Sequence, residues 1–498
     1  KECLEGNLQV VCFEKSNKIG GLWNIKDGKK DEDNKGPTVY PSLVMNTYKE
    51  LSALSDHPVP DDWPNFLPWT LFLNYIESYE DRFQLRRHIQ FNEEIVEVSR
   101  IDTESPGGRG WKVVHKNSTT GSESTDTFDA VIVATGVYSE NYWPAYKGMD
   151  VFKGTFIHSG AFWTADEYRD KDLLVVGGSF SAGDVATEAA RVSRNVFISA
   201  ENGFWVFPRL LDGKPNEYQH STRIINDITS IEDLEASLQE KVAKHVDPFE
   251  YGFNPKKGLS QQSFIANDEI WRMKRADRVH VVPGVKEFTG DSVIFSDGST
   301  QHIDHVVFCT GYKTKCSFLK DIQHDSVFDL NLYKQMFPVG VPWADNTLAF
   351  AGFWEFLGGF FPCVELQSRL IVSVFRRKLK LPEREEMQKC IDTTMADSEL
   401  QWGKPSIKTV PYVCMMDLAD QMGIQPDIAD IKVNDPELAD RILEDILLPC
   451  QFRLHGDGAK YDQSRERIVN HSTRLKNGQH GFPYVSKDGE TVYDQGCH

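Results

Sequence analysis

The clearest pattern in the chain is a set of short apolar runs, each followed at once by small residues. Residues 173–176 form one such run, and the apolar spacing of residues 185–190 just beyond it predicts a helix. An apolar run this short suits a strand that is buried on both faces of a parallel sheet. Residues 129–136 and 305–312 are near twins of each other, and in both a buried strand leads into Thr-Gly. These patterns predict an α/β fold.

The turn between residues 176 and 185 has the composition of a dinucleotide-binding turn. Backbone N–H groups at the start of a helix can face a pyrophosphate only where no bulky side chain intervenes. Small residues stand at the three glycine positions of G-x-G-x-x-G, but two of the three are not glycine, so a plain strand–turn–helix stays open as an alternative. The predicted binding residues of this turn are Gly177, Ser179, Ser181, Ala182, Gly183 and Asp184.

Weaker patterns predict the remaining elements. Residues 7–14 read as a strand that ends in an acid, and residues 71–86 as an amphipathic helix. Residues 95–114 alternate like the strands of a β-meander, and residues 285–301 like two short strands with turns. Residues 438–447 form a further expected helix, with Pro436 as its start signal.

Composition narrows the class of protein. The chain of 498 residues is long enough for two or three domains, and its net charge of −19 argues against nucleic acid or an anionic membrane as a partner. No apolar run is long enough for an integral membrane anchor. Nine scattered cysteines without a C-x-x-C predict a reduced, cytoplasmic protein. His302 and His305 would face opposite sides of one strand, and we expect no metal site.

One motif is far more specific than these patterns. Residues 152–162 read Phe-x-Gly-x-x-x-His-Ser-x-x-Phe and end just before the dinucleotide turn, and His158 is its histidine. The motif resembles the signature of the flavin-containing monooxygenases. Residues 13–23, which end in Gly-Gly-Leu-Trp, are similar to the flavin region of that family. The nearly full-length resemblance makes His158 diagnostic of the family, and a hydrogen-bonded linker is its expected role.

The resemblance implies two dinucleotide-binding, Rossmann-like domains. A discontinuous FAD-binding domain would comprise residues 1–164 and residues 301–498, the latter with a C-terminal extension, and an NAD(P)-binding domain would be inserted as residues 165–300. The first strand and first G-x-G-x-x-G of the family belong upstream of Lys1. We therefore expect the chain as given to be truncated at its N-terminus and to bind FAD poorly.

The resemblance also implies site residues. Asn46 matches an active-site asparagine, whose uncharged amide would hold a C4a-hydroperoxyflavin by hydrogen bonds; without the resemblance, an asparagine after a methionine reads as a turn or cap. Glu14 would bind an adenosine ribose. The residues that the resemblance adds to the cofactor sites are Glu14, Gly21, Leu22, Trp23, Met45, Asn46, Thr47, Gly136, Arg223 and Gly311.

Two departures from the family concern the nicotinamide nucleotide. Glu201 stands where relatives have an arginine that grips the 2′-phosphate of NADPH, and a carboxylate there favours a free 2′-hydroxyl. Arg209 and Arg223 are the candidates for a replacement charge. Phe180 replaces a more usual asparagine in the phosphate turn. The cofactors implied are FAD and NADP, with NAD as an alternative.

The implied activity is that of a flavin-dependent monooxygenase. NAD(P)H reduces FAD, O2 adds to the flavin, and one oxygen atom passes to a small-molecule nucleophile, at an amine nitrogen or a sulfide sulfur. A Baeyer–Villiger-type ketone monooxygenase and an inactive nucleotide-binding relative are the alternatives. A homodimer is the candidate assembly, and a peripheral position on the endoplasmic reticulum membrane is the alternative to a cytoplasmic one.

Overall fold

The structure is a computed structural model that describes residues 1–24, 36–102, 109–223, 225, 230–262, 264–320, 322, 330–340, 346–402, 406–478, 483–485 and 491–493. The chain divides into two compact units. Unit 1 comprises Lys1–Asn24, Thr47–Ser139 and Thr314–His498, and unit 2 comprises Ile25–Asn46 and Glu140–Lys313. Both units mix helices and strands, as predicted. The domain limits drawn from the resemblance stay a prediction.

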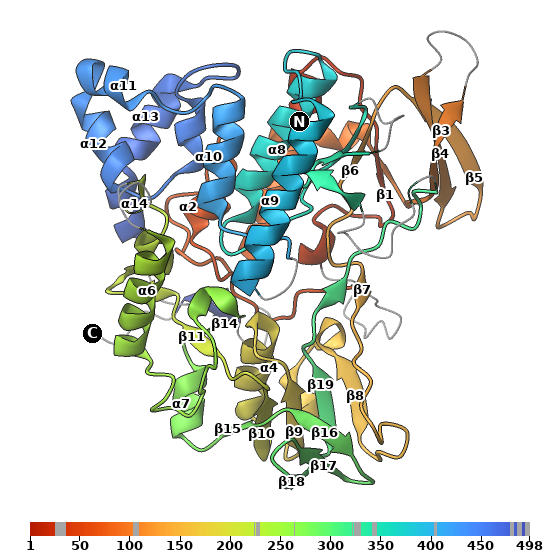
Figure 1. The fold of residues 1–498 in the computed structure, drawn as a ribbon, viewed down its shortest axis with the longest axis vertical. Helices are drawn as coiled ribbons and strands as arrows, with labels where there is room; N and C mark the ends of the chain where they lie inside the picture. The colour runs from red at the N-terminus through yellow and green to blue at the C-terminus, as the bar shows by residue number, and fades with distance from the viewer. Residues whose placement is uncertain are drawn as a thin grey trace. The chain divides into compact units, whose positions relative to one another are not determined.

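Unit 2 is built on a five-stranded, wholly parallel sheet (Figure 1). Its strand order is β15-β10-β9-β19-β8. Neighbouring strands that are not consecutive in the chain require crossover connections, which is the doubly wound arrangement of a dinucleotide-binding domain. The strands are β8 (Thr155–His158), β9 (Asp172–Val176), β10 (Asn195–Ser199), β15 (Val279–Val282) and β19 (His305–Phe308).

Alternate residues of the central strand β9 build two cores. Leu173 and Val175 point to one face, where they share a core with helix α4 (Phe180–Ala190). Leu174 and Val176 point to the other face and pack in a second core with β16 and β17. All five residues of β9 are buried, which explains why its sequence is a continuous apolar run.

The remaining strands of unit 2 are short. A three-stranded antiparallel sheet holds β16 (Val285–Phe288), β17 (Ser292–Phe295) and β18 (Thr300–His302), which confirms the predicted pair and adds a third strand. His302 therefore ends β18 while His305 begins β19, so the expectation that they share one strand is wrong. The other elements are β7 (Glu140–Asn141), β11 (Trp205–Phe207), β12 (Leu210–Leu211), β13 (Lys214–Pro215), α6 (Ile231–His245), β14 (Phe264–Ala266), α7 (Ile270–Arg275) and β20 (Tyr312–Lys313).

Unit 1 contains the predicted meander and two parallel pairs of three-residue strands, beside a shorter parallel pair of β24 (Glu355–Phe356) with β25 (Lys408–Thr409). The meander is the antiparallel sheet of β3 (Glu93–Asp102), β4 (Arg109–Asn117) and β5 (Glu123–Phe128). Strand β1 is shorter than the run predicted for it, because residues 8–11 do not pair. The three-residue parallel pairs are β1 (Cys12–Glu14) with β2 (Ile89–Phe91), and β6 (Val131–Val133) with β23 (Leu348–Phe350). Further short pairs are β21 (Leu332–Tyr333) with β22 (Phe337–Pro338), and β26 (Pro483–Val485) with β27 (Thr491–Tyr493).

The C-terminal half of unit 1 is helical. Helix α8 starts at Phe360, and Pro362 is accommodated because the first turn of a helix needs no N–H donor there. The helices of unit 1 are α1 (Glu2–Glu5), α2 (Lys49–Ser52), α3 (Trp69–Arg82), α8 (Phe360–Phe375), α9 (Arg384–Trp402), α10 (Pro411–Gln421), α11 (Ile428–Asn434), α12 (Pro436–Glu444), α13 (Tyr461–Val469) and α14 (His471–Asn477). Within the described residues, none of the helices combines the length and hydropathy needed to cross a membrane.

Candidate functional site

The turn from β9 into α4 is closely packed at its glycines. Gly177 has a φ of +138°, and a Cβ on it would lie 2.4 Å from the carbonyl oxygen of Cys309. A Cβ on Gly183 would lie 2.2 Å from Cγ2 of Ile265. Glycine is therefore required at both positions, at the first for its backbone and at both for space.

The start of α4 fits a phosphate group. Ser179 is the N-cap but makes no side-chain cap hydrogen bond, and the N–H groups of the first turn have no partner inside the helix. Ser181 is exposed, and Ala182 is fully buried beneath it. Phe180 packs edge-on against Phe264, with ring centroids 5.3 Å apart. The residues present thus form a cradle that suits the pyrophosphate of a dinucleotide.

Asp184 anchors this turn through its side-chain hydrogen bonds, and its contact with a cofactor stays a prediction. Its Oδ2 accepts a hydrogen bond from the Tyr40 hydroxyl and its Oδ1 accepts one from Asn267 Nδ2 at 3.0 Å. Burial raises the pKa of the Asp184 carboxyl, although the nearby Arg209 guanidinium opposes the shift. Asn267 also holds the chain just before and at the start of α7, because its Oδ1 accepts from the N–H groups of Glu269 and Ile270 at 2.8 and 2.9 Å.

Arg209 is bound to the segment that carries Asn46. Its Nη2 donates to Asn46 Oδ1 at 2.7 Å and its Nη1 donates to Asp268 Oδ2 at 2.7 Å. The residue is 7 % exposed. Its donors are already engaged, so Arg209 does not supply the replacement charge for a 2′-phosphate that the sequence suggested. Arg223, the other candidate, is buried at 5 % exposure, and its role stays a prediction.

Glu201 lies just beyond the carboxyl end of β10, where the sequence places it. Its side chain is 62 % exposed, and its Oε1 lies 3.8 Å from Nζ of Lys256. The hydroxyl of Ser296 donates to Glu201 Oε2 at 3.3 Å. A carboxylate at this strand end is suited to a ribose hydroxyl. Lys256 is the cation beside it that the sequence did not indicate.

His158 links β8 to the Thr-Gly turn after β19. Its Nδ1 accepts from the N–H of Gly160 at 3.2 Å, so Nε2 must carry the proton that it donates to the carbonyl oxygen of Gly311 at 3.1 Å. Burial lowers the pKa of His158 to about 4, against the effect of the Gly311 hydrogen bond. The imidazole is therefore neutral and has the geometry of a linker, not of a general acid.

The predicted flavin residues of unit 1 differ in their surroundings, and open space lies beside the two glycines among them. Glu14 ends β1, and its Oε1 accepts from the N–H of Ser16 at 2.8 Å. Gly21 and Gly136 have φ values of +54° and +79°, and a Cβ on either would meet no atom within 4 Å. Leu22 is exposed, whereas Trp23 packs edge-on against Phe72. Thr47 is half-buried, and in unit 2 Met45 is buried and Gly311 has a φ of +84° with open space beside it.

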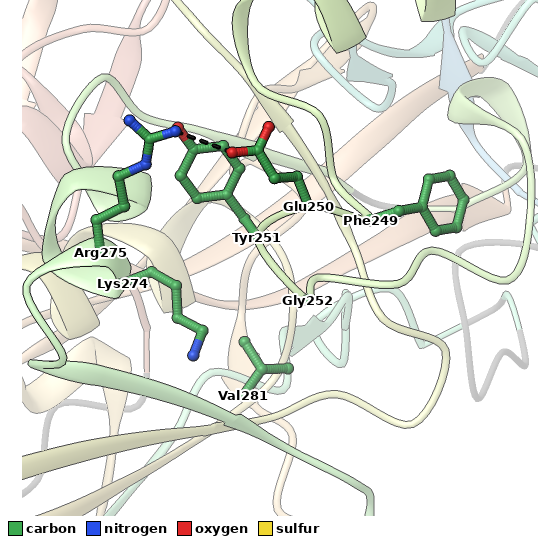
Figure 2. Close-up of a pocket in the computed structure, with 7 residues that line it drawn as sticks. All are labelled: Phe249, Glu250, Tyr251, Gly252, Lys274, Arg275 and Val281. Atoms are coloured by element: carbon green, nitrogen blue, oxygen red, sulfur yellow. Dashed lines mark hydrogen bonds and ion pairs between the residues drawn. The ribbon is translucent and has the colours of Figure 1, made fainter.

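A surface pocket of unit 2 lies away from these residues. Its volume is about 440 Å³, and it contains none of the predicted site residues. Figure 2 shows Arg275 paired with Glu250 at 3.0 Å and lying over the ring of Tyr251. Two of the three charged side chains that line the pocket, Arg275 and Glu250, are thus paired with each other.

One group of possible metal ligands occurs in the described part of the chain. It consists of Asp172, His302 and Asp304. Both carboxylate oxygens of Asp172 are already hydrogen-bonded, one to Arg194 Nη1 at 2.9 Å and the other to Asn195 Nδ2 at 2.8 Å. These hydrogen bonds give Asp172 a structural role in the cluster.

Comparison with known proteins decides the family. The family model described as flavin-binding monooxygenase-like matches residues 1–480. The chain belongs to this family. It is 33 % identical over 487 residues to flavin-containing monooxygenase 5 of Rattus norvegicus, covering 96 % of this chain and 90 % of that protein. It is 32 % identical over 490 residues to flavin-containing monooxygenase 2 of Homo sapiens, covering 95 % and 89 %.

Solved structures share the fold of this flavin-dependent monooxygenase. S-allyl-L-cysteine S-oxygenase from Allium sativum superposes with a TM-score of 0.63 at 22 % identity, covering 95 % of each chain. Cyclohexanone monooxygenase from Rhodococcus sp. Phi1, bound to NADP+, gives a TM-score of 0.57 at 18 % identity, covering 84 % of this chain and 93 % of that one. The predicted fold class, family, monooxygenase activity and cofactors FAD and NADP are thereby confirmed.

The sequence did not indicate the residues that support the site. Tyr40, Asn267 and Asp268 hold Asp184 and Arg209 in place, and none of them falls in a recognised motif. The available signal was a run of three polar residues, Asn-Asp-Glu, directly after the apolar strand β14. Such a run reads as an ordinary turn until the partners of its side chains are seen.

Proposed function

We propose that this monooxygenase oxygenates small soft nucleophiles at nitrogen or sulfur. The balanced reaction is NADPH + H+ + O2 + substrate giving NADP+ + H2O + N-oxide or S-oxide. FAD, when bound, supplies the hydride acceptor and the oxygen-activating chemistry. The observation that carries the proposal is the cradle at the start of α4, where Gly177 and Gly183 have no room for a side chain, in a chain that matches the family over residues 1–480.

Roles of single residues follow from their chemistry. The N–H groups at the start of α4 would bind the pyrophosphate of the nicotinamide nucleotide, and Glu201 with Lys256 would contact its adenosine ribose. Glu14 would bind the adenosine ribose of FAD. Asn46 would donate a hydrogen bond to the reacting oxygen, because its side chain is uncharged and held in one orientation. These residues supply binding and orientation, and no acid–base pair is required of them.

The test is a product assay with a thioether, methyl p-tolyl sulfide. Nicotinamide oxidation is followed with NADPH and with NADH, and sulfoxide and H2O2 are quantified in the same samples. One sulfoxide formed per nucleotide oxidised supports the proposal. A flavin-loaded protein that oxidises neither nucleotide contradicts it.

A Baeyer–Villiger activity is the second candidate, because the fold is shared with cyclohexanone monooxygenase. Cyclohexanone in the same assay distinguishes the two. Lactone formation without sulfoxide would favour the ketone reaction, and sulfoxide without lactone the proposed one.

We also infer the wider organisation from the resemblance. Residues 165–300 would form the nicotinamide domain, and residues 1–164 with residues 301–498 the FAD domain. The eight cysteines among the described residues are all free, which supports a reducing, cytoplasmic compartment. A peripheral membrane position stays the alternative. A homodimer stays a prediction that light scattering tests.

A further inference from the structure

The guanidinium of Arg209 clamps three consecutive residues. Its Nε donates to the carbonyl oxygen of Met45 at 3.1 Å, and its Nη2 donates to the carbonyl oxygen of Val44 at 3.3 Å and to Oδ1 of Asn46 at 2.7 Å. On its other side, Nη1 donates to Oδ2 of Asp268 at 2.7 Å, and the backbone N–H of Arg209 donates to Oδ1 at 2.9 Å. Arg209 therefore connects the backbone and the side chain of the 44–46 segment to Asp268.

The chemistry of arginine decides which way the amide of Asn46 faces. A guanidinium has only donors, so the atom of Asn46 that faces it must be the oxygen. The amide nitrogen Nδ2 then points away from Arg209 and is the end that can reach a ligand. With the opposite rotation of the amide, the NH2 group would meet the cation and the contact would be repulsive.

Asp268 keeps the guanidinium in position. It binds both the backbone and the side chain of Arg209, and the ion pair offsets the cost of burying the positive charge. Lysine cannot replace this arrangement, because a single ammonium lacks the planar fork that spans Asp268 on one side and Asn46 on the other.

We propose that Arg209, held by Asp268, is a positioning residue for the oxygenation. It fixes the amide of Asn46 so that Nδ2, a donor, is presented to the reacting oxygen. The inference rests on the proposed role of Asn46. Loss of the clamp leaves hydride transfer from the nucleotide intact but lets reduced O2 escape as H2O2, by NADPH + H+ + O2 giving NADP+ + H2O2.

The first test separates oxygenation from nucleotide oxidation. In Arg209→Met and Arg209→Lys we expect sulfoxide formation to fall by about 10- to 100-fold, the usual effect of losing a residue that orients a reacting group. Flavin reduction by NADPH should change by less than about threefold, with H2O2 replacing the sulfoxide. Arg275→Gln is the control, since Arg275 is an exposed arginine of the same unit. Arg209→Lys keeps the charge, so it remains informative if the methionine variant does not fold.

The second test asks which end of the amide is used. Asn46→Asp keeps an oxygen acceptor for Arg209 but has no N–H group, whereas Asn46→Ala loses both. We expect both variants to lose sulfoxide formation to the same extent, with Asn46→Asp as thermostable as the wild type. Asn46→Asp that forms sulfoxide at the wild-type rate would overturn the proposal.

The third test uses the protein without cofactors. Thermal unfolding of Arg209→Met, Asn46→Ala and the double variant forms a double-mutant cycle. We expect Asn46→Ala to lower Tm by about 1–3 °C less in the Arg209→Met background than in the wild type. Additive shifts would show that the two side chains do not interact.

The outcomes separate this inference from the proposed function. If the flavin-loaded wild type forms no sulfoxide with either nucleotide, the proposed function fails. If the wild type forms sulfoxide and the Arg209 variants still form one sulfoxide per nucleotide oxidised, the positioning role fails while the proposed function stands.

Discussion

The buried imidazole of His158 makes the stability of unit 2 depend on pH. The residue is 1 % exposed, and burial lowers the pKa of its imidazole from 6.5 to about 4. The perturbation that tests this is His158→Gln. Glutamine can donate to the carbonyl oxygen of Gly311 and accept from the N–H of Gly160, but it does not titrate.

The magnitude follows from the two pKa values. Between about pH 6.5 and pH 4, the imidazole of His158 is protonated in the unfolded chain but neutral in the folded chain. The contribution of the neutral imidazole to the free energy of unfolding is therefore fully present above pH 6.5 and is lost as the pH falls toward 4. The whole shift is worth about 3 kcal/mol, of which about 2 kcal/mol is lost on going from about pH 8 to about pH 5. For a unit of this size that loss lowers Tm by about 4–8 °C.

The assay is thermal unfolding of the wild type and His158→Gln across this pH range. The Tm values of the two proteins should differ by a constant offset, because glutamine differs in shape from histidine. The slope of Tm against pH is therefore the readout. His220, whose pKa is also lowered to about 4 by burial, is present in both proteins and cancels.

The reasoning is refuted if His158→Gln loses stability with falling pH as steeply as the wild type. In that case the imidazole would titrate alike in the folded and unfolded chains.

Three further predictions address binding and stability. Gly177→Ala should raise KM for NADPH by about tenfold or more, because its Cβ would press on the carbonyl of Cys309; steady-state kinetics at an unchanged flavin content would show it. Glu201→Arg should lower KM for NADPH relative to NADH by about tenfold, whereas Glu201→Gln should have a smaller effect; an unchanged ratio in both would exclude contact with the ribose. Lys49→Met should lower the free energy of unfolding in urea by about 3 kcal/mol, because the buried ammonium donates to three backbone carbonyls that would lose their donor. Lys244→Met, at an exposed lysine, is the control and should have little effect.

Local patterns in the sequence predicted the elements that depend on local chemistry. Residues 173–176 are buried on both faces because β9 is the central strand of its sheet. A continuous apolar run is the pattern expected of such a strand. The alternation at residues 95–114 likewise predicted the meander. Pro436 was a correct start signal for α12, because a proline in the first turn of a helix costs no hydrogen bond.

Long-range partners were beyond the reach of these patterns. Arg209 and Asn46 are 163 residues apart, and no periodicity connects them. The sequence therefore offered Arg209 as a ligand for a phosphate, since an arginine in a nucleotide domain suggests that role. Only its partners show that its donors are already in use. Lys256 was missed for the same reason, because it reaches Glu201 from a distant loop.

Three neighbouring side chains after β14 serve three different places. Asn267 holds Asp184 on the nucleotide helix, Asp268 holds Arg209 and through it Asn46, and Glu269 pairs with Arg191 near the end of α4. A shift of this three-residue segment would therefore move Asp184, Arg209 and Arg191 together. Under the roles proposed above for α4 and Asn46, it would disturb nucleotide binding and oxygenation at the same time.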